Sequence, residues 1–311
     1  MDDPAFVGLR FALYVVLMLL VGLPAFGLYA LKGSERVPGA VIPFRHLLGA
    51  LAVLGIALSA LALIVLAASM SGVAPGDVDK ASIDAVLTET SIGSAWQVRI
   101  VALLAIVWLS VIGWRRLKLG LVFASTMGAV ALGSLAWISH GASSEGATGW
   151  IHLVNNIVHL LAAGVWIGAL LSLGLLLFRR TSAMSGEHVV LSHRTLEGFS
   201  TVGTVVIALI VVSGLVNSWI LIGPAGFPAL FTTLYGQLLL TKLALFVAML
   251  GLAWTNRSRL TPALATALRA DDHKSAVQAL RRSLMLETIV AVVILLLVAW
   301  LGLLAPPGSD T

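Results

Sequence analysis

The chain has 311 residues, of which 59% are hydrophobic and 11% charged, and its mean hydropathy is +1.03. This much apolar surface exceeds what one water-soluble core can bury, which excludes a soluble domain and favours a membrane protein. The formal charge of +5 does not indicate nucleic-acid binding, because the apolar runs leave no folded soluble face for a basic patch.

Eight apolar segments predict membrane-spanning helices, because about 20 apolar residues cross the hydrocarbon of a bilayer. A turn signal at 223–228 divides the uncharged stretch between Glu197 and Lys242 into two spans. In the connection 71–94, residues 83–87 predict a short interfacial helix. The predicted fold is all-α, a single transmembrane domain over 1–311 with spans at 7–31, 46–70, 95–114, 119–139, 151–178, 198–222, 235–255 and 284–304.

Basic residues predict the orientation of the helices, because lysine and arginine in short connections stay on the cytoplasmic side. The first, third, fifth and seventh connections contain 15 of the 19 basic residues, and Lys80 is the only basic residue in the other connections. Both termini are therefore predicted to face outward, N-out and C-out. The N-terminal segment lacks a clean cleavage site, so we expect the first span to be retained.

Polar residues are concentrated at the start of the fifth span. His152, Asn155, Asn156 and His159 follow each other at i, i+3, i+4 and i+7, which places them on one helix face. His140 ends the fourth span, one short connection away, and is predicted to meet His152 near the outer surface. The simpler interpretation is that these histidines are packing ties between helices.

The histidines are predicted to form two separate ion stations. His152 and His159 lie about 10 Å apart along the helix axis at 1.5 Å per residue. One ion cannot bind both, because metal–nitrogen bonds are about 2 Å long. We therefore expect an outer station at His140 and His152 and a deeper one at His159, as in an ion path.

Imidazole alone does not identify the metal, because copper, zinc, iron and nickel all accept it as a ligand. The chain has no cysteine, which excludes thiolate ligation. Met70, at an outer helix end, is a weak candidate thioether ligand for Cu(I).

Other polar residues within the spans are candidates to tune such a path: Asn217 in the sixth span and Gln237 and Lys242 in the seventh. Lys242 lies about 10 Å deep, so it must pair, reach water or lose its proton. Arg99 is expected to extend to the outer interface, and Glu287 to pair with Arg281 or Arg282.

The residues after His159, a small-residue stretch followed by Trp166-Ile167-Gly168, resemble the hallmark of the CopD copper-resistance family. The likeness covers about 140–304, whereas the first four spans match only in number and topology. Further segments of this chain occur in the order expected of that family: Phe199-Ser200, 213–217, 233–242, Asn256-Arg257, 260–262 and Glu287.

The resemblance implies a bacterial inner-membrane protein of copper homeostasis, surrounded by lipid and taking copper from the periplasm toward the cytoplasm. We expect the copper ion to be Cu(I). It also implies a partner, a small periplasmic copper carrier of the CopC type. His140 and His159 match the family's histidines. Asn156 stands where many relatives are expected to have an acid, which puts metal selectivity in doubt.

Two other functions compete with copper transport. Histidines on neighbouring spans can ligate haem iron, which would make the chain an electron-transfer protein, and the chain could instead only dock a periplasmic copper carrier. An enzyme is not expected. ATP-driven pumping by this chain alone is excluded, because the sequence contains no nucleotide-binding loop.

Overall fold

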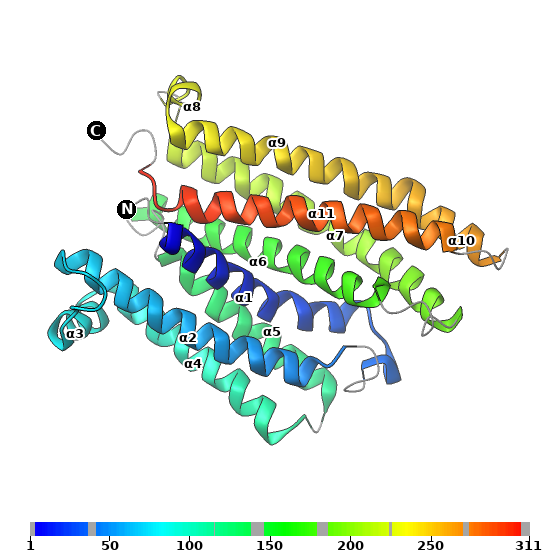
Figure 1. Ribbon diagram of the computed structural model, residues 1–311, viewed down its shortest axis with the longest axis horizontal. Helices are drawn as coiled ribbons and strands as arrows, with labels where there is room; N and C mark the ends of the chain where they lie inside the picture. The colour runs from blue at the N-terminus through cyan, green and yellow to red at the C-terminus, as the bar shows by residue number, and fades with distance from the viewer. Residues whose placement is uncertain are drawn as a thin grey trace.

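The computed structural model describes residues 4–36, 42–114, 116–137, 146–178, 186–223, 226–269 and 274–305 (Figure 1). Within these ranges the regular structure is helical and contains no strand. Eight of the described helices are long and apolar enough to cross a membrane. The predicted all-α fold with eight candidate membrane-spanning helices is therefore confirmed.

The eight long helices follow the predicted spans closely. Shorter elements are η1 (Gly33–Arg36), α3 (Lys80–Glu89), α8 (Ala229–Thr232), the π-helical turn η5 (Asn256–Leu260) and α10 (Thr261–Arg269). The 3₁₀ turn η2 (Ser134–Trp137) directly extends α5. The long helices are α1 (Pro4–Tyr29), α2 (Phe44–Ser71), α4 (Ser91–Ile112), α5 (Leu117–Gly133), α6 (Gly146–Leu177), α7 (Gly186–Ile222), α9 (Leu234–Thr255) and α11 (Lys274–Leu301).

The largest differences from the prediction are at the starts of α7 and α11. These helices begin 12 and 10 residues earlier than predicted, at Gly186 and Lys274. Hydropathy marks only the apolar part of a helix, whereas polar turns can continue the helix beyond the hydrocarbon. The predicted helix in the 71–94 connection is present as α3, where Asp79 caps the first turn by accepting a hydrogen bond from the Ser82 amide at 2.8 Å.

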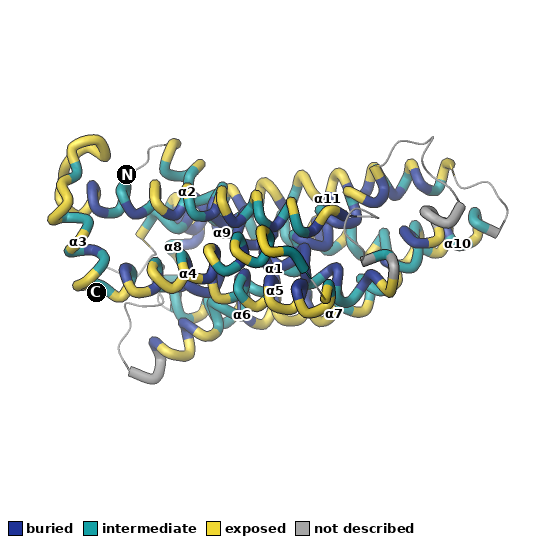
Figure 2. The backbone as a smooth tube through the Cα atoms, turned by 90° about the horizontal axis from the view of Figure 1, so that it is seen from below, coloured by how far each residue is buried: buried dark blue, intermediate teal, exposed yellow. Residues whose placement is uncertain are grey.

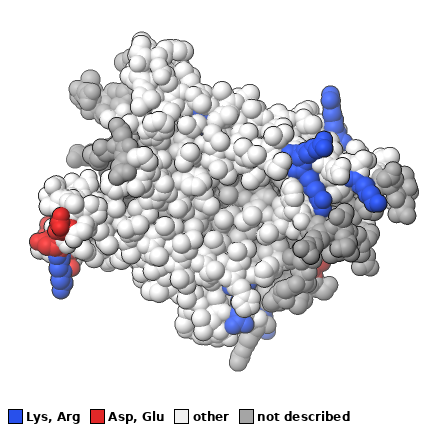
Figure 3. Space-filling model, viewed as in Figure 1, with Lys and Arg blue, Asp and Glu red and all other residues white. Residues whose placement is uncertain are grey.

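The bundle has two chemically different ends. Helix α1 begins and α11 ends at the same end, beside α3 and α8, and we call this the terminal end (Figure 1). The opposite end, with α10, we call the basic end, because lysines and arginines gather there in the view of Figure 3, whereas acidic side chains show at α3. An even number of membrane crossings puts both chain ends on the same side of the membrane. That this side is the outer one stays a prediction.

Helix α1 lies in the middle of the bundle and packs on α2, α5, α6 and α11. Its contact with α6 is a crossing of two glycines, Gly22 and Gly168: a Cβ added to Gly168 would lie 2.2 Å from the carbonyl carbon of Gly22. Small residues let membrane helices approach this closely. At this crossing the two helix backbones therefore contact each other directly. Figure 2 shows the resulting pattern, with buried positions inside the bundle and exposed positions along its outer edge.

Helices α7 and α9 lie at the periphery. Large apolar side chains on them are exposed, among them Leu215, Trp219, Val247 and Trp254, each about two-thirds accessible. Such a surface is stable only when lipid covers it, because exposed apolar area in water is unfavourable. These two helices therefore form much of the lipid-facing wall on the C-terminal side.

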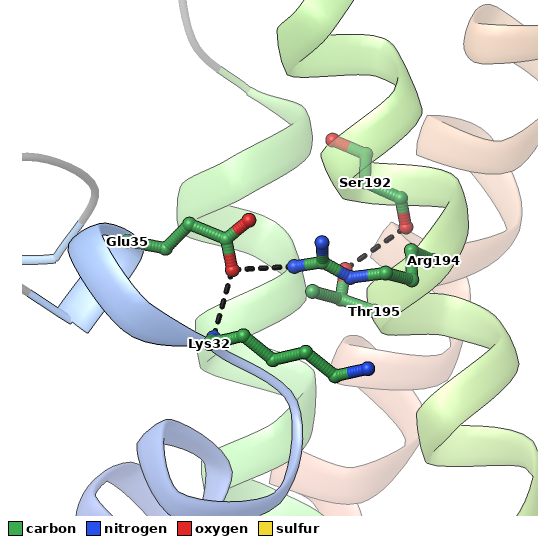
Figure 4. Close-up of polar contacts among 5 residues, drawn as sticks. All are labelled: Lys32, Glu35, Ser192, Arg194 and Thr195. Carbon is green, nitrogen blue, oxygen red and sulfur yellow. Dashed lines mark hydrogen bonds and ion pairs between the residues drawn. The ribbon is translucent and has the colours of Figure 1, made fainter. Parts of the chain in front are cut away.

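An ion pair joins the N-terminal and C-terminal helices at the basic end (Figure 4). The Glu35 carboxylate of η1 accepts hydrogen bonds from the Arg194 guanidinium of α7 and from the Lys32 backbone amide, the latter at 2.8 Å. Partial burial alone would raise the pKa of Glu35, but these two hydrogen bonds and the positive charges of both residues hold that pKa below its usual value.

Arg99 differs from the prediction that it extends to the membrane interface. Its side chain is fully buried, and Nε donates a hydrogen bond to Ser134 Oγ at 2.8 Å. The face of α4 that carries Arg99 is turned toward η2 and the bundle interior, not toward lipid. A position along the helix indicates depth, but only packing decides the direction in which a long side chain extends.

Candidate functional site

The polar residues of the fifth span lie on α6, which is unbroken from Gly146 to Leu177. His152 is 3% exposed, while Asn155, Asn156 and His159 are half-buried. Asn155 and His159 both contact α7 by hydrogen bonds. Those two side chains, one helical turn apart, thus lie at the interface between α6 and α7.

His159 is held by Ser213 of α7, with 2.8 Å between Nδ1 and Oγ. The hydroxyl of Ser213 already donates to backbone carbonyls of its own helix, to Leu209 and, at 3.3 Å, to Ile210. A serine hydroxyl has one proton, so with that proton directed to the Leu209 or Ile210 carbonyl, Nδ1 of His159 donates in this contact. In this tautomer the neutral imidazole has its lone pair on Nε2, the nitrogen that a metal ion would bind.

Asn155 extends the same network toward the terminal end. Its Nδ2 donates to the backbone carbonyl of Ser213 and to Oδ1 of Asn217, both at 2.8 Å. The predicted path residue Asn217 is thereby brought together with the α6 residues. Two hydrogen bonds from one amide fix the relative height of α6 and α7, which keeps His159 opposite Ser213.

Ser213 is a site residue to which the sequence analysis assigned no role. It is 2% exposed and contacts both Asn155 and His159. A signal existed in the sequence: Ser213 and Asn217 are four residues apart, as are Asn155 and His159. In antiparallel helices two such pairs can face each other, with 155 opposite 217 and 159 opposite 213.

Two further residues, Gly214 and Lys242, shape the surroundings of His159: the first leaves space beside the ring, and the second brings a positive charge near it. The imidazole Cε1 lies 3.5 Å from the position that a Cβ would occupy on Gly214, so the ring packs against a glycine. Lys242 of α9 is half-buried and lies within electrostatic range of His159. A positive charge at this distance would repel a second cation, which makes Lys242 relevant to how an ion is held.

The remaining predicted residues are not brought into this cluster. Met70 is 61% exposed at the end of α2, a helix that packs on α1, α3 and α4. Gln237 is exposed and makes only a long contact, 3.4 Å, to the carbonyl of Phe231. His140 lies outside the described residues. Among the residues that the structure describes, no three histidine or acidic side chains form a metal-binding group.

The small-residue stretch after His159 has a packing role. Gly164 and Gly168 face α1, where an added Cβ would meet the backbone of Met18 or of Gly22. Between them, Trp166 is 2% exposed and packs edge-to-face on Phe199 of α7, with ring centroids 5.4 Å apart. The two rings lie on the basic-end side of His159 and fill the space between α6 and α7 there.

Two family models match the chain. "Copper resistance protein D-like, N-terminal domain" matches residues 1–150, and "Copper resistance protein D" matches residues 193–301. The likeness therefore extends into the first four helices, which the sequence analysis had matched only in number and topology. His152 and His159 lie between the two matched segments.

Three curated relatives agree with these models. Copper resistance protein D of Pseudomonas syringae pv. tomato is 41% identical over 98% of both chains, and inner membrane protein YebZ of Escherichia coli K12 is 27% identical over 96% of this chain and 98% of its own. Copper transport protein CutJ of Bacillus subtilis is 30% identical over 78% of this chain, which corresponds to 44% of CutJ. No solved structure matches the chain.

Proposed function

This chain belongs to the copper resistance protein D family of multi-pass inner-membrane proteins, and from that premise we propose that it transfers copper ions across the membrane along α6. The ion moves as Cu(I) from the periplasm toward the cytoplasm. His140 and His152 form the outer station, and His159 forms the deeper one. Asn155, Asn156, Asn217, Gln237 and Lys242 tune the path.

The observation that carries this proposal is the hydrogen bond between His159 and Ser213. It orients the ring and, in the tautomer with the proton on Nδ1, leaves the lone pair on Nε2 for a ligand in the middle part of α6. Metal-binding histidines commonly have the other ring nitrogen held in this way, because the hydrogen bond fixes both the tautomer and the ring direction.

The charge distribution supports the orientation that this direction assumes. The basic end holds most of the lysines and arginines, and the positive-inside tendency favours a cytoplasmic basic end and a periplasmic terminal end. Ions then reach His152 before His159. A periplasmic copper carrier of the CopC type would dock at the terminal end, where Met70 is exposed.

The test is Cu(I) binding to the purified protein, measured by competition with a chromogenic chelator. Changing His159→Ala should lower the affinity at least about 10-fold, the size of effect typical of disturbing a metal ligand or its support. His46→Ala is the matched control, since His46 is exposed at the start of α2 at the other end of the bundle.

Equal copper affinity in wild type and His159→Ala would contradict the proposal. An absorption spectrum of the same samples tests the haem alternative, because a haem band without bound copper would identify an electron-transfer protein. Loss of one copper site in His159→Ala also separates transport from docking, since His159 lies far along α6 from the terminal end.

A further inference from the structure

A second polar group lies on the basic-end side of Trp166, in a cavity of about 270 Å³ between α6, α7, α9 and α11. Trp166, Phe199 and other mostly apolar side chains line it. Its polar lining consists of Glu287 of α11, Asn256 at the end of α9, and Ser200, Thr204, Arg257 and Thr261. None of these residues belongs to the proposed copper path.

Glu287 is the unusual member of this group. Its side chain is 2% exposed, and it accepts a hydrogen bond from Asn256 Nδ2 at 2.8 Å. The predicted pairing with Arg281 or Arg282 is wrong: Arg281 donates to the carbonyl of Leu177 at 2.6 Å, and no ion pair among the described residues includes Glu287. A buried carboxylate without a cationic partner is costly by several kcal/mol.

Asn256 adds a second oxygen to the cavity wall. While its Nδ2 is used by Glu287, its Oδ1 is buried and has no hydrogen-bond partner among the described residues. An unsatisfied buried carbonyl oxygen costs about 1–3 kcal/mol. The cavity thus presents a carboxylate and an amide oxygen, both buried and both short of positive partners.

Arg257 is the other charged residue in the described lining of this cavity. Its Nη1 donates to Thr204 Oγ1 at 2.6 Å, and its side chain is exposed. The guanidinium therefore stabilises the α7 wall at the edge of the cavity and makes no described hydrogen bond to Glu287. The need for a positive partner at Glu287 remains.

Oxygen ligands of this kind suit hard cations, whereas Cu(I) prefers sulfur and nitrogen ligands. We propose that Glu287 and Asn256 bind a hard monovalent cation, a proton or a sodium ion, whose occupancy is coupled to copper movement past His159. The proposed coupling rests on the proposed copper function. The proposed cation binding rests only on the cavity and its lining residues.

Trp166 and Phe199 connect the two sites. Both rings line the cavity, and Trp166 follows His159 by seven residues, about 10 Å along α6. A change in the charge of Glu287 alters the cavity on one side of this ring pair. A copper ion at His159 adds positive charge on the other side of the pair. Two sites that bias one shared element influence each other reciprocally.

The binding test uses the full-length protein in nanodiscs without copper. Equilibrium binding of ²²Na⁺ and infrared detection of carboxyl protonation are measured for wild type, Glu287→Gln and Glu197→Gln, the last being an exposed carboxylate of α7 outside the cavity. We expect one of the two signals in wild type, its loss in Glu287→Gln and its retention in Glu197→Gln. If neither signal depends on Glu287, the site is refuted.

Asn256→Leu keeps the test decisive if Glu287→Gln fails to fold. This variant removes the unpartnered oxygen and should weaken sodium binding or shift the carboxyl titration by about 10-fold or more in affinity, the scale for loss of a supporting ligand. An unchanged signal in Asn256→Leu contradicts the two-residue site.

Coupling is tested in proteoliposomes that take up copper under an imposed proton gradient or sodium gradient. One gradient should accelerate uptake about 10-fold in wild type, within the usual range of coupling energies, and have no effect in Glu287→Gln. Cu(I) should still bind at His159 in both proteins, but its affinity should depend on the coupled cation only in wild type. An equal response of the two proteins refutes the coupling. If the proposed copper function is wrong, the ²²Na⁺ binding or carboxyl protonation measured without copper should still depend on Glu287.

Discussion

The helices around α1 and those around α9 are packed in opposite ways. In the most apolar stretch of α1, 67% of the residues are buried, against 11% in α9. Helix α1 meets its neighbours through glycines at backbone distance, whereas α9 packs mainly on α11 and turns large apolar side chains outward. The helices around α1 are held by close backbone contacts, whereas the helices around α9 are packed more loosely.

The polar chemistry follows this difference. In the tightly packed region Arg99 is enclosed and bound to Ser134. In the open region Ser213 orients the imidazole of His159, and Glu287 lies beside a cavity. Ion movement needs both properties, because a rigid support holds ligands in place while loosely packed helices can rearrange at low cost.

The largest effect is expected where the first region contacts α6. In Gly168→Ala the new Cβ would lie 2.2 Å from the backbone of Gly22, and backbone cannot yield as a flexible side chain does. Overpacking of this type costs about 1–3 kcal/mol or more. Gly174→Ala on the same helix is the control, since no heavy atom lies within 4 Å of its added Cβ.

Thermal unfolding in detergent measures this prediction. A fall in Tm for Gly168→Ala but not Gly174→Ala would support our proposal that the eight helices form a single domain joined at this crossing. Equal Tm values for the two variants would show that α1 and α6 can separate freely.

Ser213→Ala should produce the next largest effect, in the open region. Without Ser213 Oγ the imidazole of His159 loses the partner that fixes its tautomer, so Cu(I) affinity should fall about 10- to 100-fold. Stability should change by only about 0.6 kcal/mol, the average for a hydrogen bond between membrane helices. Chelator competition measures the first quantity and thermal unfolding the second.

Ser172→Ala is the matched control for that experiment. Ser172 is another fully buried serine, on α6, and its Oγ has no hydrogen-bond partner in the part of the chain that the structure describes. Its replacement should leave copper affinity unchanged. If both variants lose affinity alike, loosened packing and not the orientation of His159 controls binding.

Arg99→Met should have a smaller effect on Tm and on copper affinity. This variant tests whether the tightly packed region has only a structural role. Exchanging a buried charge for an apolar side chain of similar volume is often neutral or stabilising, and Ser134 Oγ keeps its hydrogen bond to the carbonyl of Ala131 at 2.7 Å. We expect Tm to stay the same or rise and copper affinity to stay unchanged. Reduced copper uptake at unchanged Tm would mean that the tightly packed region takes part in transport.

Glu35→Gln should have the smallest effect. The ion pair with Arg194 is partly exposed, and such pairs contribute about 0–1 kcal/mol. Because the pKa of Glu35 is lowered in the fold, the stabilisation is complete above the ordinary carboxyl pKa of about 4.3 and disappears as the pH falls through the lower folded value. The difference in Tm between wild type and variant, measured at neutral pH and below pH 4, should shrink toward acid. A constant difference would contradict the electrostatic origin.

The sequence was sufficient to predict the spans, because hydropathy and turn residues act locally. It was also sufficient to place Asn155 and His159 on one face, since helical periodicity is fixed. It could not tell that α7 would be the helix facing them, so Ser213 was missed. Arg99 and Glu287 were misjudged for the same reason: the partner of a polar side chain depends on which helices become neighbours, and this is decided by contacts far apart in the chain.

The exposure of α9 has a consequence for the surrounding bilayer. Since α11 covers one side of α9 and acyl chains cover much of the rest, the tilt of α9 depends on the hydrocarbon thickness that these chains set. Helix α9 carries Lys242 at one level, and Asn256 follows its end at another. We therefore expect fatty-acid chain length to shift the heights of these two side chains relative to α6.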